Sequence, residues 1–503
     1  MESKNIGRGS SDLKDRTASG LFWSAFGNGA QQIVTMLTGI ALARLLRVED
    51  YGLVALLTVF SIIAGNLQES GLTSVLAVRK EVDGRHFNAV FWFSVCVSGI
   101  LYAMLFLAAP LIAAFNHAEE LTLLARVSFL GFFISSFGTA PAAWLFRHLM
   151  VREKTSSQVA ASMISGVVGL AAAAAGCGCW ALVAMDLTYK LIYTSMVWHF
   201  CPWRPSLSVS HRLWMGMVGS GSRILLANVL TTLNNQLLQG VLGHYFPLKQ
   251  VGYYSQANKW TLLSSGLLSG MTSSVAQPVL ATVGVNSDRQ TRVFRKMLRF
   301  SAFTSFPAMA GLALVAPEFI PLAIGDKWAA CVPYLMVLCA GGAFVMVNGV
   351  FTHLMIACGC PGLSLRSTAA FLVCQVLLVV FFATQGDMLP LLVGIALLQP
   401  VWMLVLTALC RRLVGISLRS VLADTLPFLS AALLMAGISG WAVGKLFCDS
   451  VFHAGLWRLA PLLGKMFIAV GIYGMVMKVY HPDVFTEGME FLKGKLLKTA
   501  AKQ

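Results

Sequence analysis

Long uncharged apolar segments recur along the whole chain, and they constrain its fold more than any other feature. An α-helix needs about 20 such residues to cross the roughly 30 Å hydrocarbon layer of a membrane. Inside that layer every backbone N–H and C=O must be bonded within the protein, and a helix achieves this within one segment. Charged residues make up 12% of the 503 residues, about half the share found in soluble proteins. We therefore predict an all-α integral membrane protein.

The apolar segments and the breaks between them predict about fourteen transmembrane helices. The shortest break, between the fifth and sixth spans, is supplied by Gly176-Cys177-Gly178. The predicted spans cover residues 18–46, 50–78, 87–115, 121–146, 157–177, 179–200, 215–245, 252–283, 298–324, 329–357, 367–385, 388–410, 421–446 and 457–480.

Lys and Arg are concentrated in alternate loops between these spans, which sets the predicted orientation. If the N-terminus is cytoplasmic, most basic residues fall on the cytoplasmic side, as the positive-inside rule requires. The opposite side then holds only Arg44, Arg47, Lys249, Lys327, Lys445 and Arg458. An even number of spans returns the C-terminus to the cytoplasm. This bias also accounts for the net charge of +16, so we expect no nucleic-acid partner.

An internal repeat is visible at an offset of 200 residues: Asn28 aligns with Asn228, and Gly52 with Gly252. Each copy holds six spans, an even number, so both copies enter the membrane in the same sense, as parallel repeats do. We predict two parallel-repeat six-helix lobes followed by two C-terminal helices. The predicted parts are a tail (1–17), the N-lobe (18–200), a cytoplasmic linker (201–214), the C-lobe (215–410), helices 13 and 14 (421–480) and a basic tail (481–503).

Polar side chains recur at helical spacing on one face of several spans. Because polar groups in hydrocarbon are costly, and because these amides and hydroxyls recur at equivalent places in both lobes, we predict a polar central cavity. Hydrogen bonding between packed helices is the alternative. The candidate cavity residues are Asn28, Gln31, Gln32, Thr35, Asn228, Thr231, Asn235, Gln239, Asn258 and Lys259.

Ionisable residues inside the spans supply further candidates. Glu69 lies on a polar stripe without a local cation, and with Asp186 it is a candidate for ion coupling. A structural partner elsewhere is the alternative for Glu69, and an i,i+4 pair with Lys190 is the alternative for Asp186. Arg44 and Arg223 are candidates for attracting a phosphate head group, although either could also extend to the membrane surface.

No motif of an enzyme is present. The chain has no P-loop, no H-E-x-x-H and no G-x-S-x-G sequence. Cys177-Gly-Cys179 and Cys358-Gly-Cys360 each lack a second ligand pair at the spacing of a metal site. We therefore expect a protein that is not an enzyme and that needs no metal or cofactor.

Several motifs resemble one family of exporters. The run Ala41-Leu42-Ala43-Arg44-Leu45-Leu46, continuing through Asp50-Tyr51-Gly52, is similar to the first hairpin of polysaccharide flippases. Glu69-Ser70-Gly71-Leu72, Gly252-Tyr253-Tyr254 and Gly325-Asp326-Lys327-Trp328 are further matches. On these residues the chain resembles the Wzx-type polysaccharide and O-antigen flippases of the multidrug/oligosaccharidyl-lipid/polysaccharide exporter superfamily, especially the colanic-acid-exporter-like branch.

This resemblance implies flipping of undecaprenyl-diphosphate-linked oligosaccharide repeat units from the cytoplasmic to the outer leaflet by alternating access, for exopolysaccharide, capsule or lipopolysaccharide assembly. It implies a bacterial inner-membrane protein with both termini cytoplasmic. The implied partners are the lipid-linked oligosaccharide and membrane lipids, with a polysaccharide polymerase and a chain-length regulator as candidates. The alternatives are an ion-coupled multidrug antiporter of the same fold, disfavoured by the scarcity of carboxylates in the spans, and a non-transport membrane component of polysaccharide synthesis.

Overall fold

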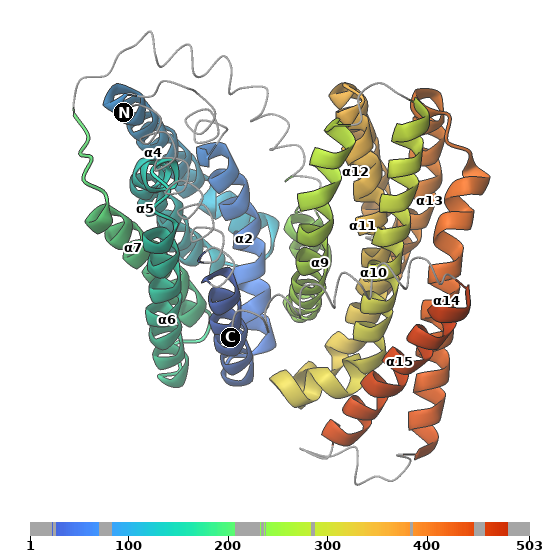
Figure 1. The fold of residues 1–503 in the computed structure, drawn as a ribbon. Helices are drawn as coiled ribbons and strands as arrows, with labels where there is room; N and C mark the ends of the chain where they lie inside the picture. The colour runs from blue at the N-terminus through green and yellow to red at the C-terminus, as the bar shows by residue number, and fades with distance from the viewer. Residues whose placement is uncertain are drawn as a thin grey trace, which may run out of the picture. The chain divides into compact units, whose positions relative to one another are not determined.

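The computed structural model describes residues 23, 27–69, 83–206, 232, 236, 238–282, 287–382, 386–446 and 458–480. All regular secondary structure in these residues is helical, and ten of their helices are long and apolar enough to cross a membrane. The predicted all-α membrane fold is therefore confirmed. The chain divides into two compact units, Met1–Gly252 (unit 1) and Tyr253–Gln503 (unit 2), which we describe separately (Figure 1).

Unit 1 is a bundle in which α4 packs on α5, α6 packs on α7, and α7 also contacts α5. The helix α2 lies against α5 and α7. Its helices are residues 27–45, α2 (Val48–Glu69), α4 (Gly84–Phe115), α5 (Leu121–Arg147), α6 (Val151–Ala174), α7 (Cys179–Phe200) and residues 238–245.

Unit 2 is built around α10, which contacts α11, α14 and α15. The helix α11 packs on α13, and α14 packs on α15. The elements are α9 (Leu248–Thr282), which begins in unit 1, α10 (Ser287–Ile324), the 3₁₀ turn η1 (Asp326–Cys331), α11 (Val332–Ala357), α12 (Pro361–Phe382), α13 (Met388–Val414), α14 (Leu418–Leu446) and α15 (Leu459–Tyr480).

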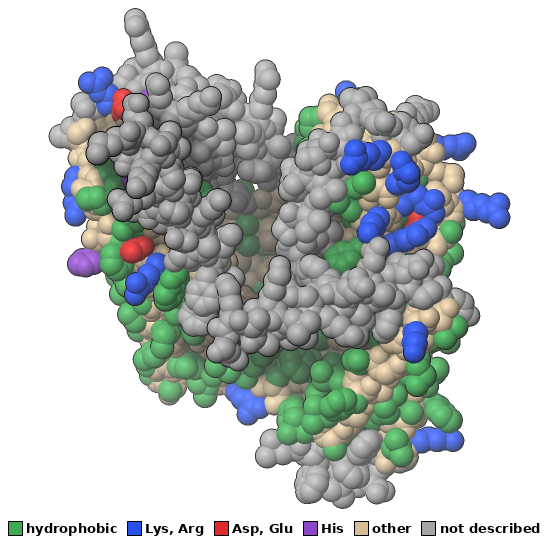
Figure 2. Space-filling view, in the orientation of Figure 1, with side chains coloured by type: hydrophobic (Ala, Val, Ile, Leu, Met, Phe, Trp, Pro, Cys, Tyr) green, Lys and Arg blue, Asp and Glu red, His purple; other side chains and the backbone are tan. Residues whose placement is uncertain are grey.

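Apolar side chains cover much of the outer surface of these helices, as a membrane protein requires (Figure 2). Leu107 of α4 is 76% exposed, and Phe467 and Val479 of α15 are both 78% exposed. Large apolar patches of this kind are costly in water, and a hydrocarbon environment removes that cost.

Most predicted span limits agree with the helices to within a few residues, and the largest difference is in α10. This helix begins at Ser287, whereas its apolar pattern begins at residue 298. The additional turns carry Arg289, Arg292 and Arg295, which are good helix formers but contribute nothing to an apolar run. Hydropathy finds the part of a helix that lies in lipid and misses the part that extends beyond it.

The turns predicted to lie on the outer side gather at one end of unit 1. A side chain at Gly178, between α6 and α7, would meet Asp50 at the start of α2. The ring of His244 stacks on Phe115, at the end of α4, with 4.3 Å between centroids. At the opposite end, the Ser206 N–H donates to Asn88 at 2.9 Å. The described spans of unit 1 therefore alternate in direction, as predicted.

Two of the motifs that resemble the exporter family stabilise helix ends. The carboxylate of Asp50 accepts the Arg47 N–H at 2.9 Å, at the entry to α2. In the second motif, Gly325 has φ of +100°, a conformation that favours glycine. Trp328 is fully buried. Asp326 pairs with Arg458 at 2.5 Å, which connects η1 to the start of α15.

The predicted parts of the chain are described to different extents. The sixth predicted span ends at Phe200, as α7 does, but the linker 201–214 is described only as far as residue 206. Predicted helices 13 and 14 correspond to α14 and α15, which pack on α10. The predicted tails, 1–17 and 481–503, lie outside the described residues.

Candidate functional site

The helix of residues 27–45 exposes two chemically different faces. Asn28 and Thr35 are exposed on one face, next to the half-buried Gln31. Ile33 and Leu37 are 61% and 60% exposed on another, which the rotation of about 100° per residue separates from the first. The apolar face suits lipid, whereas exposed amides and hydroxyls in a span suit a space that holds water.

The polar face meets α7 through a direct hydrogen bond. The Gln31 amide donates to the Tyr189 hydroxyl at 3.2 Å. Tyr189 lies parallel to Tyr193, with 6.1 Å between ring centroids and 3° between ring planes. Lys190, on the same helix, bonds Asp186 at 2.6 Å. Amide, phenol, carboxylate and ammonium groups are thus gathered on one side of unit 1.

Asp186 has its counter-charge on its own helix, which is the alternative that its spacing to Lys190 offered. The Asp186 side chain is 45% exposed and that of Lys190 is 19% exposed. The chain of Lys190 also lies over Gly131 of α5, where an added Cβ would come within 2.8 Å of Nζ. The pair therefore fixes a lysine between α5 and α7 while one carboxylate faces outward.

Tyr189 and Tyr193 were not among the predicted site residues. Tyrosine in a span is usually counted as an apolar residue, although its hydroxyl needs a polar partner. Asp186, Tyr189, Lys190 and Tyr193 recur at i, i+3, i+4 and i+7, the spacing of one helix face. That pattern was the available signal.

The remaining predicted cavity residues have different surroundings. Gln239 is buried, and its amide donates to the Ala55 carbonyl of α2 at 3.1 Å, so it serves packing between helices. In unit 2, Asn258 and Lys259 of α9 are half-buried. Gln32 is half-buried and Arg44 is exposed, both on the helix of residues 27–45.

Several predicted residues cannot be placed. Glu69 is the last residue of α2, and its side chain lies outside the described part of the chain. Asn228, Thr231, Asn235 and Arg223 also lie outside the described residues. The cavity on the side of the seventh span and the role of Glu69 therefore stay predictions.

A buried ion pair connects α10 to α15 in unit 2. Lys465 Nζ lies 2.7 Å from Glu318 Oε1 and donates to the Leu314 carbonyl at 3.2 Å. The two side chains are 12% and 13% exposed. Neither residue was among the predicted site residues. One acid and one base isolated in two different spans were the signal for a pair.

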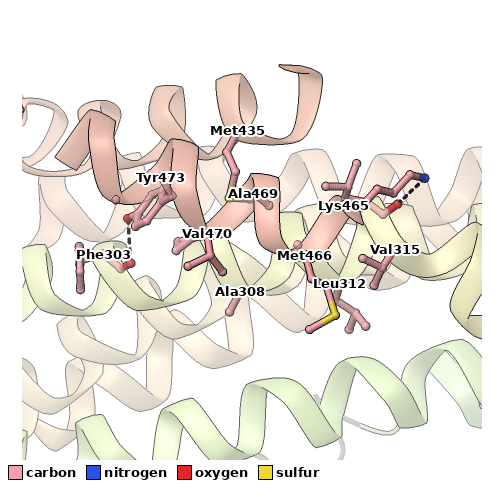
Figure 3. Close-up of a pocket in the computed structure, with 14 residues that line it drawn as sticks. Phe303, Ala308, Leu312, Val315, Met435, Lys465, Met466, Ala469, Val470 and Tyr473 are labelled. Atoms are coloured by element: carbon pink, nitrogen blue, oxygen red, sulfur yellow. Dashed lines mark hydrogen bonds between the residues drawn. The ribbon is translucent and has the colours of Figure 1, made fainter. Parts of the chain in front are cut away.

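An apolar pocket of about 560 Å³ lies beside this ion pair, between α10, α14 and α15 (Figure 3). Its two polar lining side chains are bonded within the protein, because Tyr473 donates to the Phe303 carbonyl at 2.9 Å and Lys465 to Leu314. The pocket therefore offers hydrocarbon surface to an occupant. The lining is Phe303, Pro307, Ala308, Gly311, Leu312, Leu314, Val315, Met435, Lys465, Met466, Ala469, Val470, Tyr473 and Gly474.

Comparison with known proteins decides the family. Residues 41–333 match the family described as "Polysaccharide biosynthesis protein". The chain belongs to the polysaccharide biosynthesis protein family. This confirms the resemblance predicted from the motifs of the first hairpin and of the turn at Gly325.

The relatives of this chain have low sequence identity to it, but the matches extend over most of its length. The chain is 21% identical to an "Uncharacterized membrane protein in cps region" of Klebsiella pneumoniae, over 77% of this chain and 81% of that protein. It is 24% identical to the "Lipopolysaccharide biosynthesis protein WzxC" of Escherichia coli K12, over 69% of this chain and 70% of that protein.

Among solved structures, this family member shares its fold with "Lipid II flippase MurJ, inward closed conformation". The TM-score is 0.72 at 12% identity, over 92% of this chain and 99% of that chain. The match extends the shared fold beyond the two repeats to most of the chain.

Proposed function

We propose that this protein flips an undecaprenyl-diphosphate-linked oligosaccharide from the cytoplasmic to the outer leaflet by alternating access. The sugar head group would pass along the polar face of unit 1, and the hydrocarbon tail would remain in apolar surroundings. The exported unit would serve the assembly of a surface polysaccharide.

The observation that carries the proposal is the exposed polar face of the helix of residues 27–45, with Gln31 bonded to Tyr189. A sugar cannot enter hydrocarbon without losing its hydrogen bonds, each worth several kcal/mol in an apolar medium, on the order of 4–6. Amides and hydroxyls both donate and accept hydrogen bonds. They can therefore replace water around successive sugar hydroxyls as the head group moves.

The charged groups of this surface suit a charged carrier. Arg44, which is exposed on the helix of residues 27–45, is the candidate for attracting the carrier phosphates, because Lys190 is already neutralised by the more exposed Asp186. Coupling of transport to an ion gradient through Glu69 is part of the proposal.

The pocket between α10, α14 and α15 suits the tail. It extends along α10 from Phe303 to Val315, about 18 Å at 1.5 Å per residue. All of its polar groups are bonded internally, and the neighbouring face of α15 exposes Phe467 and Val470, as a helix in contact with lipid does. We assign the pocket to the isoprenoid tail of the cargo lipid.

The names of related proteins support the class of cargo. WzxC is described as a lipopolysaccharide biosynthesis protein, and MurJ as a lipid II flippase. Both names refer to a molecule that contains a lipid, as the proposed cargo does.

Deletion of the gene, in a strain without other exporters of this family, tests the proposal. The expected result is loss of one surface polysaccharide and accumulation of its lipid-linked repeat unit in the cytoplasmic leaflet. Both should be reversed by the wild-type gene and not by Gln31→Leu combined with Tyr189→Phe. Normal polysaccharide without accumulated intermediate in the deletion strain would overturn the proposed function.

A further inference from the structure

One end of unit 2 is strongly basic (Figure 2). The Thr291 hydroxyl donates to the Val414 carbonyl at 3.0 Å, so the first turns of α10 lie beside the junction of α13 and α14. Both segments are rich in positive charge, and their basic side chains therefore share one surface. The residues are Arg289, Arg292, Arg295, Lys296 and Arg299 of α10, with Arg411 and Arg419 of the junction.

A single carboxylate organises two of these arginines. Asp424 of α14 accepts Arg295 Nε at 2.6 Å and Arg295 Nη2 at 3.0 Å. It also accepts Arg299 Nε at 2.6 Å. The Asp424 side chain is 1% exposed, whereas those of Arg295 and Arg299 are 37% and 39% exposed. The carboxylate is covered, and both guanidinium groups extend from it to the surface.

This cluster keeps one net positive charge and most of its donors. Asp424 engages only the Nε–H of Arg299 and one edge of Arg295. Among the described residues, Nη1 of Arg295 and both Nη groups of Arg299 make no hydrogen bond to the carboxylate. The planar guanidinium presents pairs of N–H groups that match two oxygens of a phosphate. Because Asp424 already orders both long side chains, a ligand loses less side-chain entropy on binding them.

The position of the cluster along α10 and α14 matches the depth at which lipid head groups lie in a bilayer. Arg299 lies about 38 Å along α10 from its end at Ile324, and Asp424 about 33 Å along α14 from Leu446, at 1.5 Å per residue. The hydrocarbon core is about 30 Å thick, and about 40–45 Å with head groups. Leu434 and Ile438 of α14 are 52% and 47% exposed, and a rotation of about 100° per residue places both within about a quarter turn of Asp424, so apolar surface for an acyl chain continues along this side of the helix.

We propose that Arg295 and Arg299, oriented by Asp424, bind the phosphate of an anionic phospholipid in the leaflet at this end of unit 2. The lipid's acyl chains would lie along the exposed Leu434 and Ile438 of α14, a helix outside the predicted repeat. This site holds a resident lipid, and it does not depend on which cargo the protein moves.

The test uses the purified full-length protein in detergent, with phosphatidylglycerol or phosphatidylcholine added. Native mass spectrometry measures bound lipid, and thermal unfolding measures the stabilisation. Phosphatidylglycerol should bind in preference to phosphatidylcholine and raise the melting temperature. Arg299→Gln should weaken phosphatidylglycerol binding about fivefold, the effect of one basic residue near a charged membrane surface. Arg292→Gln is the matched control, since Arg292 is an exposed arginine on the same helix outside the Asp424 cluster.

A second variant separates loss of lipid binding from loss of folding. Asp424→Asn with Arg299→Gln removes one charge of each sign, so no buried carboxylate is left without its partner, and it should also lose the lipid preference. Equal loss of binding in Arg292→Gln and Arg299→Gln would overturn the proposal in favour of a diffuse surface charge. Stabilisation by inorganic phosphate as strong as that by phosphatidylglycerol would overturn the assignment to a lipid.

Discussion

Gly52 and Gly252 make reciprocal contacts, each lying against a backbone carbonyl on the other's helix. Gly52 of α2 packs against the Leu248 carbonyl, and Gly252 of α9 packs against the Val48 carbonyl. The two glycines are 200 residues apart, and so are Val48 and Leu248, which is the offset of the internal repeat. The repeat seen in the sequence is therefore expressed as a symmetric crossing within unit 1, at which neither glycine has room for a Cβ.

This crossing predicts that alanine is harmful at both glycines. Gly52→Ala and Gly252→Ala should each destabilise the protein by about 1–3 kcal/mol, because the new methyl group overlaps backbone that cannot move aside easily. Gly65→Ala is the control on α2, since a Cβ there meets nothing within 4 Å, and it should be neutral or stabilising by up to about 1 kcal/mol. Thermal unfolding in detergent gives the comparison. Equal melting temperatures for Gly52→Ala and Gly65→Ala would show that the crossing is not close-packed.

The ion pair between Glu318 and Lys465 predicts a strong effect of removing one partner. Glu318→Gln should cost about 3–5 kcal/mol, because it leaves a buried ammonium without its counter-charge. Replacing both residues with leucine should restore most of the stability. Asp326→Asn is the control, because Asp326 pairs with Arg458 at the surface with its side chain 78% exposed. Such exposed pairs contribute about 0–1 kcal/mol. A Glu318→Gln protein as stable as Asp326→Asn would contradict the burial of the pair.

The pocket beside α15 predicts a difference between two glycines of that helix. Gly474 lines the pocket, and Gly471 does not; a Cβ meets nothing within 4 Å at either position. Gly474→Leu should fill part of the pocket and reduce complementation of the deletion strain severalfold. Gly471→Leu should leave complementation unchanged, while both variants gain the same helix propensity, less than about 1 kcal/mol. Equal complementation by the two variants, at equal amounts in the membrane, would contradict the assignment of this pocket to the tail of the cargo lipid.

The two faces of the helix of residues 27–45 predict different reactivity with water-soluble reagents. In a background without other cysteines, Asn28→Cys and Thr35→Cys should react with a charged thiol reagent, because thiolate forms where water is present. Ile33→Cys and Leu37→Cys, on the apolar face, should react at least about tenfold more slowly, because hydrocarbon raises the cost of the thiolate. Mass spectrometry of the labelled protein in membranes measures the rates. Similar slow rates at all four positions would favour packing between helices over a water-filled cavity.

The helical membrane fold could be predicted closely because its signals are local. The break at Gly176 and Gly178 appears in the structure as a turn in which both glycines have positive φ, +80° and +56°. The polar face of Asn28, Gln31 and Thr35 follows from helical spacing within one segment. The start of α10 could not be predicted from hydropathy, because Arg289 to Arg299 extend the helix beyond the apolar core.

The sequence by itself determined the fold class, most of the spans, the internal repeat and the family resemblance, because each depends on residues close in the chain or on a constant offset. Only the tertiary structure decided which polar groups meet. Gln31 and Tyr189 are 158 residues apart, and Glu318 and Lys465 are 147 apart. Asp424 becomes the centre of an arginine cluster only because α10 packs on α14. Such pairings depend on how helices pack, and no spacing within a single span encodes them.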